Sequence, residues 1–379
     1  MSNDIAALIQ QQVEEAYQAQ MPLEIIGNST KKFYGNSVKG TPLVVSQHSG
    51  IISYEPTELV ITARAGTPLD EIEEALNKHN QQLAFEPPHF SQPSTDTINT
   101  ETHNDNLFRI ATLGGTIACG LSGPARANNG SARDFVLGCE IINGRGEQLK
   151  FGGQVMKNVA GYDISRLMCG SLGTLGIILN VSLKVLPKPE AQTSLSFTLP
   201  LDDAYSMLQR INAQAYPITA SCYFNNVLTI RLAGNAQAVK ATQEKLGGEQ
   251  QQDGEHFWST IREQSHSFFN TKQPLWRIST KFNTKLDAHD LTEENTRCLT
   301  EWHGALHWLT TKTPATVLRQ YVEKIGGHAT LFKNHLNDND VDIFHPLQKP
   351  LLQIHKNLKS SFDPENILNR NKMYDFSKP

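Results

Sequence analysis

Apolar residues recur with two different periods along the first half of the chain, and the periods separate predicted helices from predicted strands. Spacings of three and four residues between Ile5 and Ala16 predict an amphipathic helix over residues 3–20. Alternation between Leu59 and Ala65 predicts a strand. The remaining predictions for this half are a strand and polar turn in 22–35, a helix from 67 to about 79, paired strands within 135–151, and a strand over 177–185.

From about residue 190 the pattern changes to a β-α-β-β-α-β order. The predicted elements are a strand at 194–199, a helix at 202–213, strands at 218–224 and 227–233, a helix at 235–246 and a strand at 249–252. This order is typical of a ferredoxin-like antiparallel unit. Pro187 and Pro189 precede it and predict a boundary. Further helices and strands follow, including a strand at 274–280, an element at 313–325 and a helix ending near 361. We therefore predict an α+β fold.

Composition is ordinary for a globular protein, with 379 residues, 39% hydrophobic and 19% charged. The formal net charge of −4 gives no reason to expect nucleic acid as a partner. The chain contains no run of 18 apolar residues, so no transmembrane helix is predicted. The first twenty residues lack the pattern of an export signal. We expect a cytoplasmic protein, with any attachment to the inner face of a membrane made through a partner.

The cysteines and histidines do not form a metal-binding pattern. The five cysteines, at 119, 139, 169, 222 and 298, are all more than three residues apart. An iron–sulfur cluster needs several thiolates at close spacing, so we expect buried, reduced thiols instead. His328 and His335 are seven residues apart and would face opposite sides of one strand. No metal site is therefore predicted.

The first chemically suggestive segment is Gly27–Gly35, which follows an apolar run. Consecutive backbone N–H groups in a tight turn form a concave nest that binds phosphate oxygens. Gly27 permits close approach, and Asn28 tolerates a left-handed conformation. Ser29 and Thr30 add hydroxyl donors. The alternative is a polar turn with no ligand.

Two further segments are rich in glycine. Residues 114–123 contain four glycines, but no clear helix is predicted after them, so they do not match a Rossmann motif. They would contact a flat or phosphorylated ligand, or else pack tightly on their own sheet. In the third segment, Gly170, Gly173 and Gly176 recur every third residue after 157–163. Three such segments spread over about 150 residues favour a ligand with separated phosphate and ring parts, such as a dinucleotide.

These residues resemble the PCMH-type FAD-binding domain, also called the vanillyl-alcohol-oxidase type. The similarity is carried by 27–35, by 111–115 with 120–123, by the long block 157–177 and by a closing segment over 362–374. More narrowly, the chain resembles the FAD-binding subunits of bacterial glycolate oxidases. The resemblance implies an FAD-binding domain of two α+β subdomains over 1–189. A ferredoxin-like antiparallel cap domain over 190–345 and a C-terminal segment over 346–379 that returns to the FAD site would follow.

The resemblance also implies a role for each matching residue. Gly27, Asn28, Ser29 and Thr30 would hold the FAD pyrophosphate, joined by Thr112, Gly114 and Gly115. Gly120 and Ser122 would lie near the ribityl chain or the flavin, and Asn158, Gly161 and Tyr162 would line the flavin. Gly176 and Ile177 would contact FAD by main chain, and Asn369 would approach from the tail. We expect noncovalent FAD, because neither of the first two segments has a His or Cys placed for attachment.

Three functions remain open at this point. The first is a glycolate oxidase subunit that binds FAD and passes electrons within a complex, beside a second FAD-containing catalytic subunit and an iron–sulfur subunit. The second is a self-sufficient dehydrogenase for glycolate or a similar 2-hydroxy acid, with Arg231, Arg277 or Lys281 holding the carboxylate. Related dehydrogenases carry Gly-His-x-Gly-Asp-Gly-Asn, which residues 327–335 do not match. The third is a scaffold without flavin.

Overall fold

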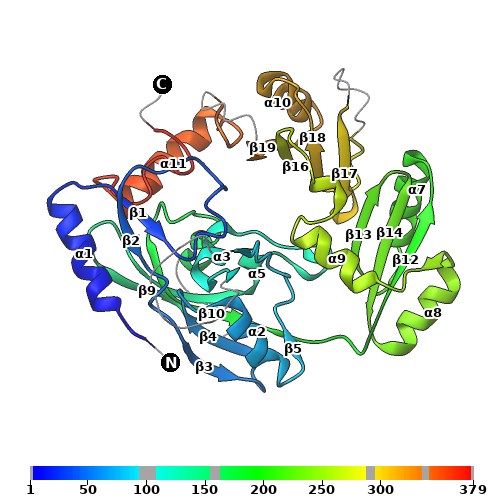
Figure 1. Cartoon of the computed structure of the whole chain (residues 1–379), viewed down its shortest axis with the longest axis horizontal. Coiled ribbons are helices and arrows are strands. Elements are labelled where there is room, and N and C mark those ends of the chain that lie inside the picture. Colours follow the sequence, from blue (N-terminus) through cyan, green and yellow to red (C-terminus); the bar gives the residue numbers. More distant parts are fainter. Residues whose placement is uncertain (1–2, 94–107, 154–162, 287–294, 335–340, 377–379) are drawn as a thin grey trace.

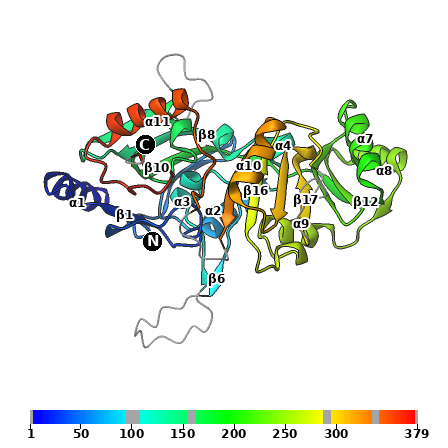
Figure 2. The same ribbon diagram turned by 90° about the horizontal axis from the view of Figure 1, so that it is seen from above.

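The computed structural model describes residues 3–93, 108–153, 163–286, 295–334 and 341–376. Figure 1 shows two halves joined side by side, with both chain ends in the half that contains the first strands. Figure 2 shows the same division from above. None of the helices among the described residues is long and apolar enough to cross a membrane.

The first half is built around one five-stranded antiparallel sheet in the order β3-β4-β10-β8-β9. Helices α2 and α3 pack on it through Leu69, Ile72 and Ile117. A parallel pair, β1 with β2, lies beside it. The elements of this half are α1 (Ala6–Gln18), β1 (Leu23–Ile26), β2 (Thr41–Val44), β3 (Ile51–Glu55), β4 (Val60–Arg64), α2 (Leu69–Asn77), β5 (Gln81–Gln82), β6 (Gln92–Pro93), β7 (Phe108–Arg109), α3 (Leu113–Cys119), α4 (Arg126–Asn129), α5 (Ala132–Phe135), β8 (Val136–Ile142), β9 (Gln148–Gly152), α6 (Ile164–Met168), β10 (Ile177–Lys184) and β11 (Leu186–Pro187).

The second half, which we call the cap, is one eight-stranded sheet in the order β15-β12-β14-β13-β17-β18-β16-β19. Its first four strands have the ferredoxin-like order that the sequence predicts. The last four repeat that order in reverse across the β13–β17 contact, which the sequence pattern did not predict. The elements are β12 (Ala191–Thr198), α7 (Leu201–Asn212), β13 (Ile218–Phe224), β14 (Val227–Gly234), α8 (Ala236–Leu246), β15 (Glu249–Gln250), α9 (Gly254–Arg262), β16 (Leu275–Ser279), β17 (Arg297–Glu301), β18 (Leu306–Thr310), α10 (Ala315–Lys324) and β19 (His328–Lys333), with single 3-10 turns η1 (Ser267–Phe269) and η3 (Trp302–Gly304).

Aromatic side chains fill the junction between the two halves. Tyr34 and Phe90 of the first half share one buried cluster with Trp302, Trp308 and Phe332 of the cap. Polar contacts join the same surfaces. Trp302 Nε1 donates to the Gly123 carbonyl at 3.1 Å, and a buried ion pair joins Arg231 Nη2 to Glu86 Oε1 at 2.7 Å. The halves are therefore packed on each other through their side chains.

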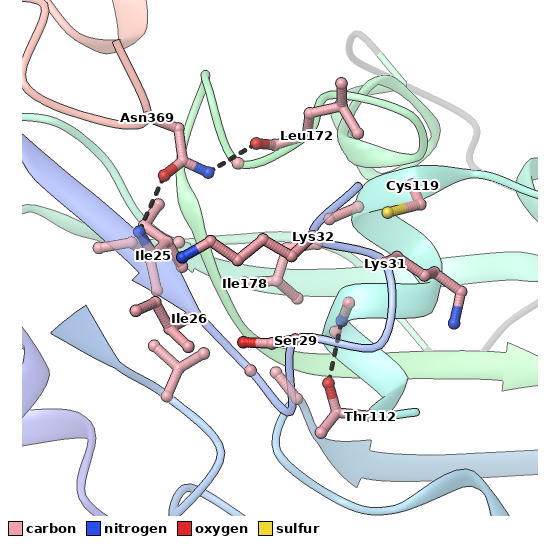
Figure 3. Close-up of a pocket in the computed structure, with 18 of the residues that line it drawn as sticks. Ile25, Ile26, Ser29, Lys31, Lys32, Thr112, Cys119, Leu172, Ile178 and Asn369 are labelled. Carbon is pink, nitrogen blue, oxygen red and sulfur yellow. Dashed lines mark hydrogen bonds between the residues drawn. The ribbon is translucent and has the colours of Figure 1, made fainter. Parts of the chain in front are cut away.

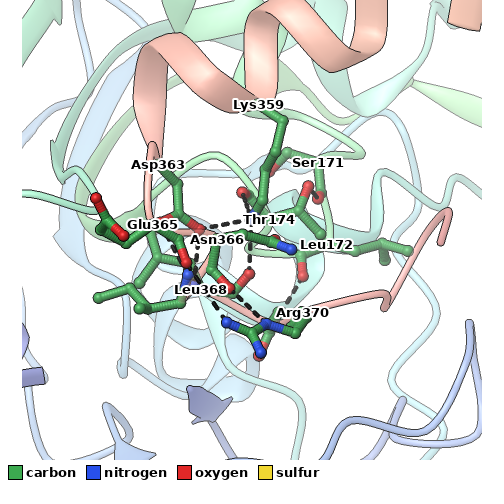
Figure 4. A network of polar contacts seen from close by, with 11 residues as sticks. Ser171, Leu172, Thr174, Lys359, Asp363, Glu365, Asn366, Leu368 and Arg370 are labelled. Atoms are coloured by element: carbon green, nitrogen blue, oxygen red, sulfur yellow. Dashed lines mark hydrogen bonds and ion pairs between the residues drawn. The ribbon is translucent and has the colours of Figure 1, made fainter. Parts of the chain in front are cut away.

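The C-terminal helix α11 (Lys349–Phe362) leads the chain back onto the first half. At its end Lys359 Nζ and the fully buried Asp363 carboxylate pair at 2.6 Å, as Figure 4 shows. Asp363 also accepts the backbone N–H groups of Ile367 and Leu368, at 3.0 and 2.8 Å. The tail then forms a parallel bridge to β1 between Leu368 and Leu23. This network sets the position of residues 366–372 beside β1.

Candidate functional site

One cavity, which we call the main cavity, lies in the first half, between the loop after β1, helix α3 and the start of β10. It has an empty volume of about 940 Å³, part of it open to solvent. Its walls come from five separate parts of the chain. The lining residues are Glu24, Ile25, Ile26, Gly27, Asn28, Ser29, Thr30, Lys31, Lys32, Tyr34, Val38, Val45, Ala65, Thr112, Gly114, Gly115, Ala118, Cys119, Leu172, Gly173, Gly176, Ile177, Ile178, Asn369 and Lys372.

The loop after β1 makes a sharp turn along one wall. Its left-handed residue is Ser29, with φ of 58°, rather than Asn28, which the sequence suggested for that role. Asn28 instead donates its side-chain Nδ2 to the carbonyl of Ile110 at 2.9 Å. The turn is closed by a bond from Lys32 N to Ser29 O at 3.1 Å. An anion-binding nest needs a left-handed residue next to a right-handed one, and Ser29 supplies the left-handed residue.

Helix α3 begins against this loop and contains the first glycines of the 114–123 segment, for which the sequence pattern predicted no helix. Thr112 caps the helix, since its Oγ1 accepts the Gly115 N–H at 3.3 Å. A Cβ on Gly27 would lie 2.8 Å from that same oxygen, so loop and helix touch. A Cβ on Gly114 would lie 2.6 Å from the Cβ of Ala65. A Cβ on Gly115 would have only the Thr112 Oγ1 nearby, at 3.1 Å, and would otherwise face open space.

Asn369 joins the tail to the other walls of the cavity. Its Oδ1 accepts the Ile25 N–H and its Nδ2 donates to the Leu172 carbonyl, both at 2.8 Å (Figure 3). A Cβ on Gly173 would lie 2.8 Å from the Asn369 Nδ2, which explains the need for glycine at that position. Asn369 is 7% exposed. Its amide is therefore occupied by backbone partners, although the residue lines the cavity.

Charged side chains on the cavity wall are mainly lysines. Lys32 Nζ pairs with Glu24 Oε1 at 2.9 Å, and Lys372 Nζ donates to the Lys32 carbonyl at 3.2 Å. Lys31 leaves the loop in the direction opposite to Lys32, as Figure 3 shows. Burial lowers the pKa of Lys31 to about 8. The described lining residues include three lysines, Lys31, Lys32 and Lys372, and one acidic residue, Glu24. The wall therefore has an excess of two positive charges.

The sequence did not single out these lysines or Cys119, which also lines the cavity. Lys31 and Lys32 follow the predicted phosphate loop directly, so an adjacent pair of cations was the available signal. Burial raises the pKa of the Cys119 thiol, and the nearby Lys31 and Lys372 offset this only in part. A protonated, buried thiol is a poor nucleophile. The side chain therefore gives no support for covalent attachment of a ligand.

Ten of the fifteen residues predicted from the sequence line this one cavity. They are Gly27, Asn28, Ser29, Thr30, Thr112, Gly114, Gly115, Gly176, Ile177 and Asn369. Gly120 is the left-handed C-cap of α3, with φ of 62°, and lies outside the lining. Ser122 also lies outside it, and its Oγ accepts the Ala132 N–H at 2.9 Å. Asn158, Gly161 and Tyr162 lie outside the described residues.

The three basic residues proposed to hold a carboxylate have different environments. Arg231 is 5% exposed and its guanidinium is already paired with the Glu86 carboxylate. Lys281 is exposed. Arg277 lines a smaller cavity at the junction of the halves, with Ser122, Gln264 and Glu301. Among the described residues no group of three or more His, Cys, Asp or Glu side chains could hold a metal ion, and His335 lies outside them.

The main cavity suits an extended anion. It offers a left-handed turn, glycines that allow close approach, and an uncompensated positive charge. A pyrophosphate carries two negative charges, which match the excess on the wall. The cavity also continues along apolar residues such as Val45, Ile177 and Ile178, which suit a flat ring.

Comparisons with known proteins agree with this description. Residues 6–95 match a family described as an FAD binding domain. The chain is 43% identical over 371 residues to the glycolate oxidase subunit GlcE of Escherichia coli, covering 98% of each protein. It is 41% identical over 88 residues to the glycolate oxidase subunit GlcD of Bacillus subtilis, which is 23% of this chain and 19% of that protein. A solved alkyldihydroxyacetonephosphate synthase has a similar fold, with a TM-score of 0.62 at 13% identity over 96% of this chain and 75% of that one.

Proposed function

The chain belongs to the family of the glycolate oxidase subunit GlcE, and we propose that it is the FAD-binding subunit of a glycolate oxidase. In this role it takes part in the oxidation of glycolate to glyoxylate. The observation that carries the proposal is the positively charged cavity, which is bounded by the loop after β1, the start of α3 and the tail. That loop lies within the part of the chain that matches an FAD binding domain.

We assign the pyrophosphate of FAD to the turn formed by Gly27, Asn28, Ser29 and Thr30, with Thr112, Gly114 and Gly115 across from it. Gly176 and Ile177 would contact the cofactor by main chain. Asn369 acts by holding Ile25 and Leu172 in place, since its amide is already bonded to both. We keep Gly120, Ser122, Asn158, Gly161 and Tyr162 as the proposed path toward the ribityl chain and ring. When bound, noncovalent FAD would supply the two-electron acceptor for the hydroxyl-bearing carbon of the substrate.

We further propose that electrons leave this chain for partner subunits, one a second flavin subunit and one an iron–sulfur subunit. The chain's five cysteines are all among the described residues and all are free thiols. A cluster would need several of them together, so an iron–sulfur centre must be supplied by another chain. Any attachment to the inner face of a membrane would also be made through these partners.

A second candidate, catalysis by this chain alone, is favoured by one observation. The junction cavity contains Arg277 and Glu301, and also the side chain of Gln264, whose amide has no hydrogen-bond partner among the described residues. Of these groups, the Arg277 guanidinium and the Gln264 amide could donate hydrogen bonds to a small carboxylate. The cavity has an empty volume of only about 340 Å³, which would admit only a small acid.

Two measurements test these functions. The purified chain is expected to show a flavin absorbance spectrum, and to be stabilised by added FAD, by about 2.7 kcal/mol at 100 times the dissociation constant. A chain with neither property would instead be a scaffold. The FAD-loaded chain is then mixed with glycolate or D-lactate and a dye acceptor. We expect turnover only after the partner subunits are added, and dye reduction at turnover rates by the chain alone would establish the second candidate.

A further inference from the structure

Lys31 is a buried cation without a matching anion. The residue is 8% exposed, and its Nζ has no hydrogen-bond partner among the described residues. Its nearest described aromatic contact is the ring of Phe90, with 5.8 Å between Nζ and the ring centroid. An ammonium group removed from water without a partner costs several kcal/mol. A buried ionisable group that lines a cavity and has a strongly shifted pKa is a candidate for a functional site.

The surroundings of Lys31 do not supply that missing anion. Cys119 of α3 and Glu263, just after α9, are the charged or titratable groups that favour its protonated form. The Glu263 carboxylate is already used, since it accepts the N–H groups of His89 and Phe90 and pairs with Arg262. The Cys119 thiol stays protonated because burial raises its pKa. Lys333 lies across Phe90 and adds a second positive charge, with its Nζ 5.8 Å from that ring.

The other two lysines of the main cavity differ from Lys31 in this respect. Lys32 has Glu24 as an ion-pair partner and its side chain is 63% exposed. Lys372 donates to the Lys32 carbonyl. Lys31 is therefore the lining lysine whose charge is both buried and without a hydrogen bond or an ion pair among the described residues. It is two residues beyond the left-handed Ser29, on the same loop.

We propose that Lys31 is the charge partner of the bound dinucleotide, donating a charge-assisted hydrogen bond to its pyrophosphate. The inference rests on the proposed FAD function and adds a residue that the glycine pattern does not identify. The loop's backbone nest would then hold one face of the anion, and the Lys31 ammonium the face toward the cap. The Lys31 Nζ is covered by protein atoms in the ligand-free structure, so its side chain would turn toward the anion on binding.

This role predicts opposite effects of one substitution on stability and on binding. In Lys31→Met, the ligand-free protein should melt at the same or a higher temperature, because a buried charge without a partner has been removed. The same variant should bind FAD about ten to a hundred times more weakly, since a charge-assisted bond is lost. A lysine with a purely structural role would lower the melting temperature instead.

The experiment uses the full chain and two probes, FAD and ADP, which share the pyrophosphate but not the flavin ring. Calorimetry gives the dissociation constant of each probe, and thermal unfolding gives the stability of the ligand-free protein. Lys39→Met is the matched control, because Lys39 is exposed on the same loop and outside the cavity lining. Lys31→Arg keeps the charge and should restore most of the affinity for both probes.

The outcomes separate this inference from the proposed function. If the unaltered chain binds neither probe, the FAD function is wrong. If the chain binds both probes and Lys31→Met binds them equally well, the role of Lys31 is wrong while the function stands. A loss of affinity for FAD but not for ADP would also overturn the pyrophosphate assignment. A lower melting temperature of ligand-free Lys31→Met would show a structural lysine. Weaker binding of both probes with undiminished stability is the result expected.

Discussion

Asn369 shows how a single side chain can build a binding site without offering any group to the ligand. Its two amide atoms are bonded to Ile25 N and Leu172 O, which belong to two different walls of the cavity. Its own backbone N–H donates to Leu23 O at 3.1 Å. The residue therefore brings three segments together, and its loss should affect both stability and binding.

Replacing Asn369 with alanine should lower the free energy of unfolding by about 2–4 kcal/mol, because it leaves a buried N–H and a buried carbonyl unpaired. Affinity for ADP should fall as well, since Ile25 and Leu172 lose their common anchor. Urea unfolding and calorimetry measure the two effects. Asn357→Ala, an exposed change on α11, should alter stability by less than about 0.5 kcal/mol. Equal stabilities of the two variants would contradict the role of Asn369.

The lowered pKa of Lys31 gives a second prediction at this scale. The pKa of Lys31 in the folded protein is about 8, below the value of 10.5 for an exposed lysine. Between pH 8 and pH 10.5, Lys31 is therefore more often protonated in the unfolded chain than in the folded protein. The contribution of Lys31 to stability therefore rises with pH across that window. A bound anion would raise the pKa again, so ADP binding at about pH 9 should take up part of a proton.

Calorimetry in two buffers of different ionisation enthalpy measures that proton uptake. The nearby groups Cys119, Glu263 and Lys333 are present in both the unaltered chain and Lys31→Met, so the difference between the two isolates Lys31. The uptake should vanish in the variant. Equal uptake in both proteins would assign the proton to another group.

At the scale of elements, helix α3 separates glycines that serve packing from those that serve the cavity. Gly114→Ala should cost about 1–3 kcal/mol of stability, because the new methyl would overlap Ala65. Gly115→Val should leave the ligand-free fold nearly as stable but weaken FAD binding at least tenfold, since its side chain would enter the cavity. Thermal unfolding and FAD titration of both variants test this. Full FAD affinity in Gly115→Val would refute the assignment of this wall.

Periodic patterns predicted many of the longer elements, and α3 shows why they missed others. The strands around Val181 and the first four strands of the cap follow from alternation, because one face of each is buried. Helix α3 has two glycines in its first turn, which lower helix propensity. Packing against Ala65 and the Thr112 cap overcome that weakness. The mirrored second half of the cap sheet depends on pairing between β13 and β17, which no local pattern encodes.

The site could be predicted only as far as it depends on backbone shape. Glycines indicate where the backbone must lie close to a ligand or to another segment. Gly27, Gly115 and Gly176 could therefore be identified from the sequence. The isolation of Lys31 was not, because it arises from Phe90 and α9, which are distant in sequence. A local pattern cannot show that a charge will be left without a partner after folding. Tertiary burial decides this.

At the scale of the whole molecule, the polar and aromatic contacts across the junction predict that the two halves unfold as one cooperative unit. All four tryptophans of the chain, at 258, 276, 302 and 308, are in the cap, so their fluorescence reports on that half. Circular dichroism reports on both halves. Because the Arg231–Glu86 pair, with side chains 6% and 23% exposed, crosses the junction, both signals should change at the same urea concentration.

Breaking this junction pair tests the coupling. Arg231→Met leaves the Glu86 carboxylate without its cation and should lower the free energy of unfolding by about 3–5 kcal/mol, with both signals shifting together. Glu74→Gln is the control, because its pair with Lys78 is exposed, 73% and 67%, and is worth at most about 0.5 kcal/mol. If the two halves were independent, Arg231→Met would shift the fluorescence transition and leave a separate dichroism transition unmoved. The double variant Arg231→Met, Glu86→Gln should recover part of the loss, since neither charge is then buried alone.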